Sequence, residues 1–253
     1  MSYKIIITRT IKEFSRHVIY RANLYSVLTN LRSRQNRGNT AHLAAVGIKE
    51  RFSSIYELKV WGDDRENDPL SGLGSSLKVT SALRESLTNF LNGLDAQTLL
   101  DVGCGDFTWM QYIDFDGKYI GIDIVESVIN KNIASYSNKN REFYVIDATS
   151  SHLPKADIVI CREVLFHLSF KDASKVLKEI FNTGCKYIIL TSDKQTLFNS
   201  DIPSGDFRVL NLAVRPFKFP SPDVAITDSG FTPLRSLNVW RSERLSPFID
   251  RLR

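Results

Sequence analysis

The sequence predicts an α/β fold with a doubly wound, mostly parallel sheet. Short apolar runs typical of buried strands alternate with amphipathic segments typical of helices, as expected for a parallel sheet with helices on both faces. Several of these runs end in an acidic residue, at the edge where ligands bind in such sheets. The five expected parallel strands lie near residues 98–102, 119–123, 142–147, 157–161 and 186–191.

Helices are expected before and between these strands. Residues 79–94 carry apolar side chains at helical spacing, with Gly93 as a stop signal, and predict the helix that leads into the first strand. Residues 109–113 and 125–136 are the expected crossover helices. Two later strand-like runs complete the sheet, at 224–227 and 237–240.

A glycine turn follows the first strand and marks the candidate cofactor site. Gly103 and Gly105 permit positive φ and leave no side chain between the main chain and an adenosine-bearing ligand. A dinucleotide motif requires a third glycine where this chain has Thr108, which disfavours a pyrophosphate. Asp123 ends the second strand 22 residues after Asp101, the usual place for a carboxylate that binds ribose hydroxyls.

At these motifs the chain resembles the class I S-adenosylmethionine-dependent methyltransferases. The glycine motif is 100–105, and later motifs follow in order at 121–123, 143–148 and 156–161. The resemblance implies S-adenosylmethionine as cofactor and a seven-stranded Rossmann-like sheet whose last pair is antiparallel. The alternative is a doubly wound domain that uses the strand-end acids only as turn and cap residues.

The resemblance also assigns parts of the cofactor to residues of this chain. Asp101 and the turn hold the methionine part, Asp123 holds the ribose hydroxyls, and Asp147 contacts the adenine amino group. The complete set of implied cofactor residues is Asp101, Gly103, Cys104, Gly105, Asp123, Ile124, Asp147, Ala148 and Cys161.

The segment after the fourth strand holds the candidate catalytic residues Arg162, Glu163 and His167. A hydroxyl acceptor must lose its proton during methyl transfer, and His167 is the first candidate for the general base because its ordinary pKa lies near neutrality. Glu163 is the second candidate. The alternative for His167 is a side chain that packs under the cofactor without chemistry. Arg162 either positions an acceptor oxygen or pairs with Glu163.

The acceptor is indicated by segments on either side of the core. Residues 71–75, which follow Trp61, and the proline-rich stretch 216–222 resemble a bacterial branch of these enzymes associated with glycan assembly. The first interpretation is O-methylation of a sugar or other small polar metabolite. The alternatives are N-methylation of a protein or small amine, and a non-catalytic module that binds S-adenosylmethionine. The Asn/Asp-Pro-Pro-aromatic segment of nucleic-acid amino-methylating enzymes is replaced by 161–164, Cys-Arg-Glu-Val, which disfavours base methylation.

Aromatic and polar residues in the C-terminal third predict a platform for a polar acceptor. Its polar members are Arg208, Asn211 and Arg215, and the aromatic ones are Phe217 and Phe219. The alternative is that the two phenylalanines fill the core.

Composition and charge limit the classes of partner that the chain is expected to bind. A chain of 253 residues with 43% hydrophobic content suffices for one sizeable α/β core. Its three cysteines follow no metal-binding spacing, so we expect reduced thiols, no metal site and a cytoplasmic location. Residues 1–60 carry 11 Lys or Arg and 3 acids, whereas residues 61–253 carry a slight excess of acids. Because the catalytic part is not basic, a small molecule or glycan is the expected partner, and no large nucleic acid is.

The basic residues 1–60 are expected to form an extension to a methyltransferase domain at 61–253. Residues 11–31 predict an amphipathic basic helix, and 32–40 a polar linker. No stretch has the length of a transmembrane helix or a secretory signal. The favoured interpretation is a helical cap. The alternatives are a transit peptide and a weak peripheral contact with an anionic membrane. The oligomeric state is not predicted.

Overall fold

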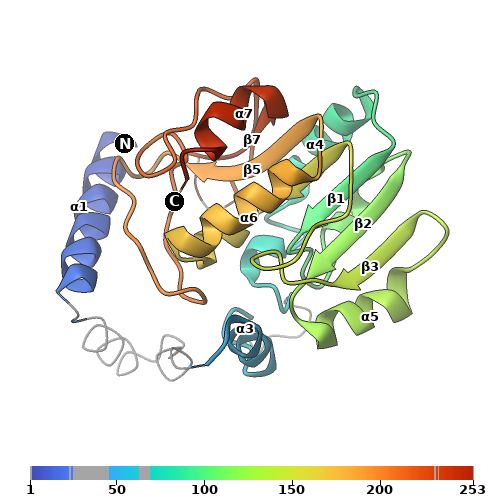
Figure 1. The fold of residues 1–253 in the computed structure, drawn as a ribbon, viewed down its shortest axis with the longest axis horizontal. Helices are drawn as coiled ribbons and strands as arrows, with labels where there is room; N and C mark the ends of the chain where they lie inside the picture. Colours follow the sequence, from blue (N-terminus) through green and yellow to red (C-terminus); the bar gives the residue numbers. More distant parts are fainter. Residues whose placement is uncertain are drawn as a thin grey trace.

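The computed structural model describes residues 2–22, 24, 46–62, 69–230, 232 and 234–252. They form a central sheet flanked by helices, with one long helix at the edge of the molecule (Figure 1). The linker expected at 32–40 and the acidic residues 63–68 lie outside the described residues.

Seven strands form one sheet in the order β3-β2-β1-β4-β5-β7-β6. The first five are parallel, and β7 runs antiparallel to both β5 and β6. The winding reverses between β1 and β4, so the loops after these strands open a crevice at the carboxyl edge. The predicted seven-stranded, doubly wound sheet is therefore confirmed. The strands are β1 Thr98–Val102, β2 Lys118–Asp123, β3 Arg141–Val145, β4 Ile158–Cys161, β5 Tyr187–Asp193, β6 Val224–Thr227 and β7 Arg235–Arg241.

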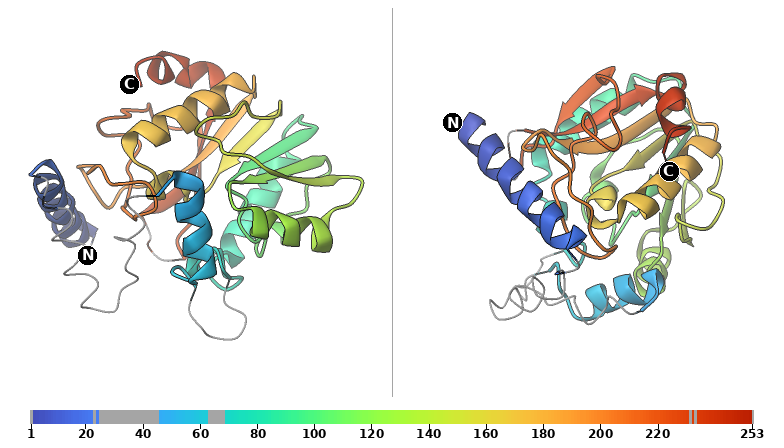
Figure 2. Two further views of the ribbon diagram at one scale, coloured as in Figure 1. Left: turned by 60° about the horizontal axis from the view of Figure 1, so that its bottom comes forward. Right: turned by 60° about the vertical axis from the view of Figure 1, so that its left-hand side comes forward.

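Helices cover both faces of this sheet (Figure 2). They are α1 Ser2–Arg21, α3 Ile48–Glu57, α4 Ser81–Asn92, α5 Glu126–Tyr136, α6 Phe170–Asn182 and α7 Ser242–Ile249. Side chains alternate along each strand, so β1 sends Leu100 and Val102 into one apolar cluster with α6 and α7, and Leu99 into a second cluster with α4. Burial on both faces explains why the central strands are continuous apolar runs.

Two helical predictions differ from the structure. The crossover helix expected at 109–113 is a single 3-10 turn, Met110–Tyr112, because too few residues separate the glycine turn from the loop before β2 to nucleate an α-helix. The N-terminal helix spans Ser2–Arg21 instead of beginning near residue 11. No helix among the described residues is long and apolar enough to cross a membrane.

The segment just before residue 60 packs into the main core. Phe52, Ile55 and Tyr56 of α3 are buried, and they belong to the same cluster as Leu100 of β1. A boundary at residue 60 separates α3 from the core that it helps to build. We therefore propose that the methyltransferase domain begins at Ile48.

Candidate functional site

A cavity opens at the carboxyl ends of β1, β2 and β4. Most of the residues predicted for cofactor and catalysis line it: Asp101, Gly103, Cys104, Gly105, Asp123, Ile124, Asp147, Ala148, Arg162, Glu163 and His167. Cys161 is the exception. Its side chain lies in the apolar core, where burial raises the pKa of the thiol, and its contact with the cofactor stays a prediction.

The glycine turn forms the floor of the cavity beside the first strand. Gly103 and Gly105 have φ values of +76° and +56°, which L-residues rarely adopt. A Cβ at Gly103 collides with the side chain of Val164, and one at Gly105 collides with Ser71. Both glycines are thus required by backbone conformation and by close packing.

Asp123 connects the end of β2 to this turn. Its carboxylate accepts hydrogen bonds from the backbone N–H groups of Gly105, at 3.1 Å, and Val125, at 3.0 Å. Burial raises the pKa of this carboxyl, while the backbone donors act in the opposite direction. The residue is positioned to hold the turn and to face a ligand in the cavity at the same time.

Asp101 is buried at the end of β1, and the Tyr119 hydroxyl donates to its Oδ2 atom at 2.7 Å. Burial raises the pKa of Asp101 to about 7, although the Tyr119 hydrogen bond lowers it. A carboxyl with this pKa is half protonated at neutral pH, and its ionised form is the one that attracts a cationic ligand group.

We expect the affinity for S-adenosylmethionine to fall as the pH drops through 7, because protonation removes the Asp101 charge that the sequence resemblance assigns to the methionine part of the cofactor. At pH 6 the dissociation constant should be about tenfold larger than at pH 8, as expected for one group titrating near 7. Calorimetric titration across this range measures the effect. The Asp101→Asn variant should bind weakly with no such pH dependence, and an unchanged slope in that variant contradicts the assignment.

The predicted adenine region has a self-contained hydrogen-bond network. Both carboxylate oxygens of Asp147 are engaged, because Oδ1 accepts from the backbone and hydroxyl of Thr149 at 2.8 and 2.7 Å, and Oδ2 accepts from Ser150 at 2.9 Å. Oδ2 has a second lone pair, so a further donor can still bind there. Ile124, Ile146 and Ala148 provide apolar walls around this point.

Residues that the sequence analysis did not assign close the cavity from the N-terminal side. The Ser71 N–H donates to Asp106 at 3.2 Å, and the Asp106 N–H donates back to the Ser71 hydroxyl at 2.9 Å. Tyr56 donates to the same hydroxyl at 3.2 Å. The sequence signal for this cover was the small-residue segment after Trp61, and it did not indicate the contacts of Ser71 with Asp106 and Tyr56.

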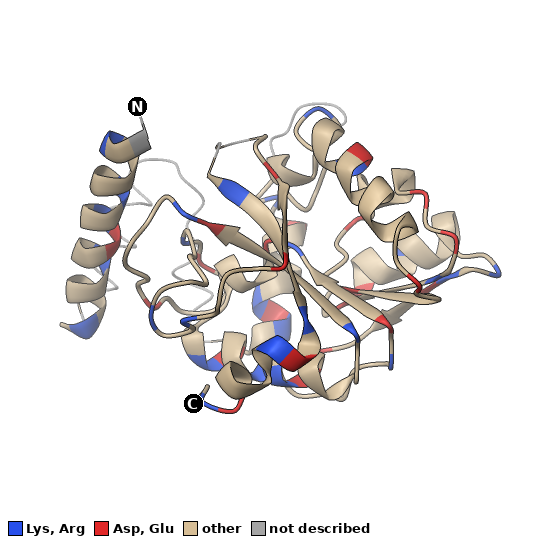
Figure 3. Cartoon of the chain, turned by 90° about the horizontal axis from the view of Figure 1, so that it is seen from above, with Lys and Arg blue, Asp and Glu red and all other residues tan. Residues whose placement is uncertain are grey.

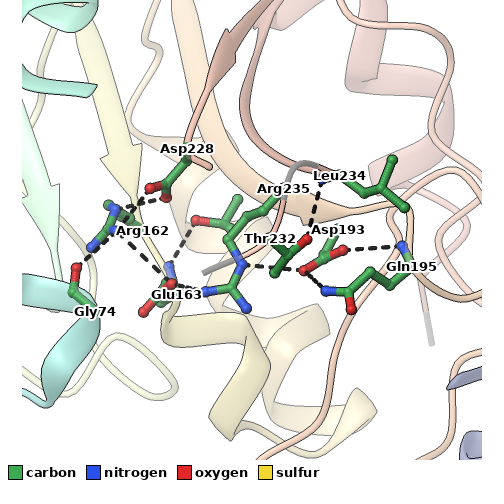
Figure 4. Close-up of polar contacts among 10 residues, drawn as sticks. Gly74, Arg162, Glu163, Asp193, Gln195, Asp228, Thr232, Leu234 and Arg235 are labelled. Carbon is green, nitrogen blue, oxygen red and sulfur yellow. Dashed lines mark hydrogen bonds and ion pairs between the residues drawn. The ribbon is translucent and has the colours of Figure 1, made fainter. Parts of the chain in front are cut away.

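Arg162 lies in a buried ionic network rather than at a free acceptor position (Figure 4). Its guanidinium donates to both carboxylate oxygens of Asp228, at 3.0 and 3.1 Å, and to the Gly74 carbonyl at 3.0 Å. Glu163 pairs mainly with Arg235 and lies 3.9 Å from Arg162. Of the two roles left open for Arg162, pairing is the one seen, with Asp228 as the closer partner.

Glu163 is held in a left-handed conformation, with φ +64°, and its N–H donates to the Thr191 hydroxyl at 2.9 Å. Burial acts to raise the pKa of Glu163, but Arg162 and Arg235 outweigh it and lower the pKa. A carboxylate with a lowered pKa is a poor proton acceptor at neutral pH. The geometry therefore favours an electrostatic role for Glu163 over that of general base.

We expect Glu163→Gln to lower the free energy of unfolding by about 2 kcal/mol, because it leaves the buried Arg235 without one charged partner. Chemical denaturation measures the change. Glu142→Gln is the matched control, since its ion pair with Lys118 is at the surface, and it should cost less than about 1 kcal/mol. Equal costs at the two positions contradict the electrostatic role.

His167 lies on a 3-10 turn, Val164–His167, directly before α6, whose start is capped by Ser169. Its Nδ1 atom is 3.0 Å from the carbonyl oxygen of Asp206. Because a carbonyl only accepts, the neutral ring carries its proton on Nδ1 and leaves a lone pair on Nε2. Burial lowers the pKa of His167, so the neutral form prevails at pH 7.

Aromatic side chains enclose this imidazole. The ring of Trp61 packs at 4.4 Å between centroids, and that of Phe207 at 5.4 Å. Trp61 and His167 both line the cavity. Together they place a flat apolar wall next to the imidazole of His167.

The acceptor platform expected in the C-terminal third is only partly realised. Phe217 and Phe219 are core residues, as the alternative reading held. Arg208 and Asn211 are buried in hydrogen bonds to backbone groups, so they cannot meet an acceptor. From this region, Phe207 is the residue that reaches the wall of His167.

The donor set and shape of the cavity fit S-adenosylmethionine. A turn without side chains, buried carboxylates at the ends of two neighbouring strands and an apolar slot beyond the second strand suit its amino, ribose and adenine groups in turn. Among the described residues, no group of three or more His, Cys, Asp or Glu side chains is arranged to hold a metal ion.

Comparisons with known proteins found a family model that matches part of this chain and solved structures that are similar to it. Residues 94–202 match the family model described as a methyltransferase domain. The chain is similar to magnesium protoporphyrin IX methyltransferase from Synechocystis PCC 6803, with 17% identity over 77% of this chain and 97% of that chain, and a TM-score of 0.48. It is also similar to human N-acetylserotonin methyltransferase, with 17% identity over 84% and 65% of the two chains and a TM-score of 0.48. No curated protein matches the sequence significantly.

Proposed function

We propose that this chain, whose residues 94–202 match the methyltransferase domain model, uses S-adenosylmethionine to methylate a hydroxyl group of a sugar or another small polar metabolite. The observation that carries the proposal is His167, a neutral imidazole in the cavity wall whose Nδ1 proton is committed to the Asp206 carbonyl. Its Nε2 lone pair is the proton acceptor that a hydroxyl substrate needs.

The cofactor is held, in this proposal, by the residues around the glycine turn. Asp101 faces the amino group of the methionine part, Asp123 accepts from the ribose hydroxyls, and Asp147 accepts from the adenine amino group. When bound, S-adenosylmethionine supplies a methyl group attached to a positively charged sulfur. This sulfur is the good leaving group, because it becomes a neutral thioether when the methyl group is transferred. The protein chiefly needs to align the acceptor atom with that methyl group.

His167 removes the proton from the acceptor hydroxyl as the new oxygen–carbon bond forms. The proton moves to Nε2, and the Asp206 carbonyl keeps the ring oriented through Nδ1. Glu163 stays ionised, and its charge stabilises the imidazolium that results. Trp61 and Phe207 prevent the ring from rotating away, because they pack against it.

The cavity wall also supports the acceptor class. Planar apolar surface beside a few polar groups is what sugar-binding sites require, and Trp61 provides such a surface at the cavity. These features support a small acceptor over a nucleic acid, because the residues expected to bind the acceptor line the cavity and do not form a basic face.

Incubation with methyl-labelled S-adenosylmethionine and a panel of sugars, sugar nucleotides, amines and peptides tests the proposal. NMR of the product distinguishes an O-methyl from an N-methyl group. An O-methylated small molecule is the expected product. An N-methylated amine or peptide overturns the choice of acceptor atom, and tight cofactor binding without any product across the panel supports the non-catalytic alternative.

A further inference from the structure

Helix α1 contacts the rest of the protein mainly through charged and polar side chains. The rings of His17 and of Phe14, which is still half exposed, also pack edge-on against Phe198. Glu13 and Arg16 are both buried and lie 3.0 Å apart as an ion pair. Glu13 also accepts a hydrogen bond from the buried Ser200 hydroxyl, and Thr10 accepts one from the Leu197 N–H at 3.0 Å. The helix is therefore fixed to the domain by its polar face.

The opposite side of α1 presents an apolar row to solvent. Tyr3, Ile7, Ile11, Phe14 and Val18 are between 50% and 81% exposed. Their spacing of three or four residues places them on one stripe of the helix. A surface helix normally buries its apolar stripe and exposes its polar face. In α1 the arrangement is reversed, and the helix lies at the edge of the molecule in both views of Figure 2.

Positive charge accompanies this row. The helix carries Lys4, Arg9, Lys12 and Arg21 besides the paired Arg16, and basic residues are blue in Figure 3. Its one acid, Glu13, is buried against Ser200 of the domain. Lys4 and Arg21 are exposed and stand one helical turn from Ile7 and Val18, next to the row. The outward surface of α1 thus combines large apolar side chains with cations and lacks anions.

We propose that α1 docks on an anionic lipid bilayer, with the row of Tyr3, Ile7, Ile11, Phe14 and Val18 inserted at the level of the headgroups. The row extends over roughly 22 Å at 1.5 Å per residue, a length suited to a helix that lies flat in the interface. Lys4 and Arg21 pair with lipid phosphates at its margins. A second copy of the chain is the less favourable occupant, because two such helices bring like charges together.

Co-sedimentation of the full chain with lipid vesicles tests the proposal. Binding is expected to vesicles of phosphatidylcholine with phosphatidylglycerol at 0.1 M salt, and to fall at least tenfold with pure phosphatidylcholine or at 0.5 M salt. Ile11→Ser should lower the partition coefficient at least fivefold, and Ile7→Ser with Ile11→Ser more than tenfold. Ile133→Ser on α5 is the matched control, because Ile133 is 46% exposed on a different helix, and it should bind like the unmodified protein.

Cofactor affinity and the melting temperature should be unchanged in all three variants, which shows that they fold. Failure of the unmodified protein to bind anionic vesicles at low salt overturns the proposal, as does equal binding by the Ile7/Ile11 double variant. Light scattering is run in parallel. A dimer that the double variant converts to monomer assigns the row to a second copy instead of a membrane.

Discussion

Replacing His167 by alanine should lower kcat by a factor of about 10² to 10⁴, the usual contribution of a general base. The affinity for S-adenosylmethionine should change less than threefold, because the residues expected to hold the cofactor lie on other strands. Since burial lowers the pKa of His167, kcat of the unmodified enzyme should rise with pH, with a midpoint below the ordinary value of about 6.5, and then level off. Steady-state kinetics with the identified acceptor and calorimetry with the cofactor measure the two quantities.

The control for this substitution is His152→Ala, since His152 is an exposed histidine that contacts Glu179 at 3.1 Å. It should leave both the rate and the pH profile unchanged. A His167→Ala enzyme with normal kcat, or one that keeps the rising pH limb, shows that His167 packs beside the cofactor without removing a proton.

The second large effect is expected at Asp123. Asp123→Asn keeps the size of the side chain but removes its charge and one of the acceptor oxygens used by Gly105 and Val125. Loss of a charged hydrogen bond to the ribose is worth about 1.5–3 kcal/mol, which corresponds to roughly 10- to 100-fold weaker binding. Both S-adenosylmethionine and S-adenosylhomocysteine should lose affinity to the same extent, because they share the ribose.

The variant should still fold but melt at a lower temperature, because the amide oxygen accepts from only one of the Gly105 and Val125 N–H groups and the NH₂ group faces the other donor. Circular dichroism and thermal melting verify this. Asp116→Asn, at an exposed loop position, is the matched control and should bind both ligands normally. Weakened binding of only the methylated ligand places Asp123 near the sulfur instead of the ribose.

The positions of the strands along the chain and of the crevice could be predicted from the sequence, because both depend on short-range signals. Apolar runs such as 98–102 specify buried parallel strands, and Gly103 and Gly105 specify a turn that tolerates no side chain. The end of the fourth strand at Cys161 was predicted, but local signals did not show that the Cys161 side chain joins the apolar cluster.

Other parts of the site depend on contacts between distant residues and left no local signal. Arg162 and Glu163 were recognised, but their partners Asp228 and Arg235 come from the antiparallel end of the sheet, more than 60 positions later. The face of α1 that contacts the domain could not be predicted either. Glu13 and Arg16 are charged residues of the kind found at surfaces, and their burial depends on Ser200, which is far away in the sequence.

The cover over the cavity has a consequence for the order of folding. The hydrogen bonds that hold it join residues far apart in the chain. Gly74 is bonded to Arg162, 88 positions away, and Arg51 is bonded to Ser204, 153 positions away. Contacts with such long loops carry the largest entropic cost and form late, after the sheet that they rest on. The central strands can therefore assemble first. The cavity is enclosed last, when the N-terminal segment that contains Arg51 and Gly74 contacts its partners, although this segment is synthesised early. The amide hydrogens of this segment should then exchange faster than those of the sheet. A bound cofactor should slow the exchange of this segment more than that of the sheet.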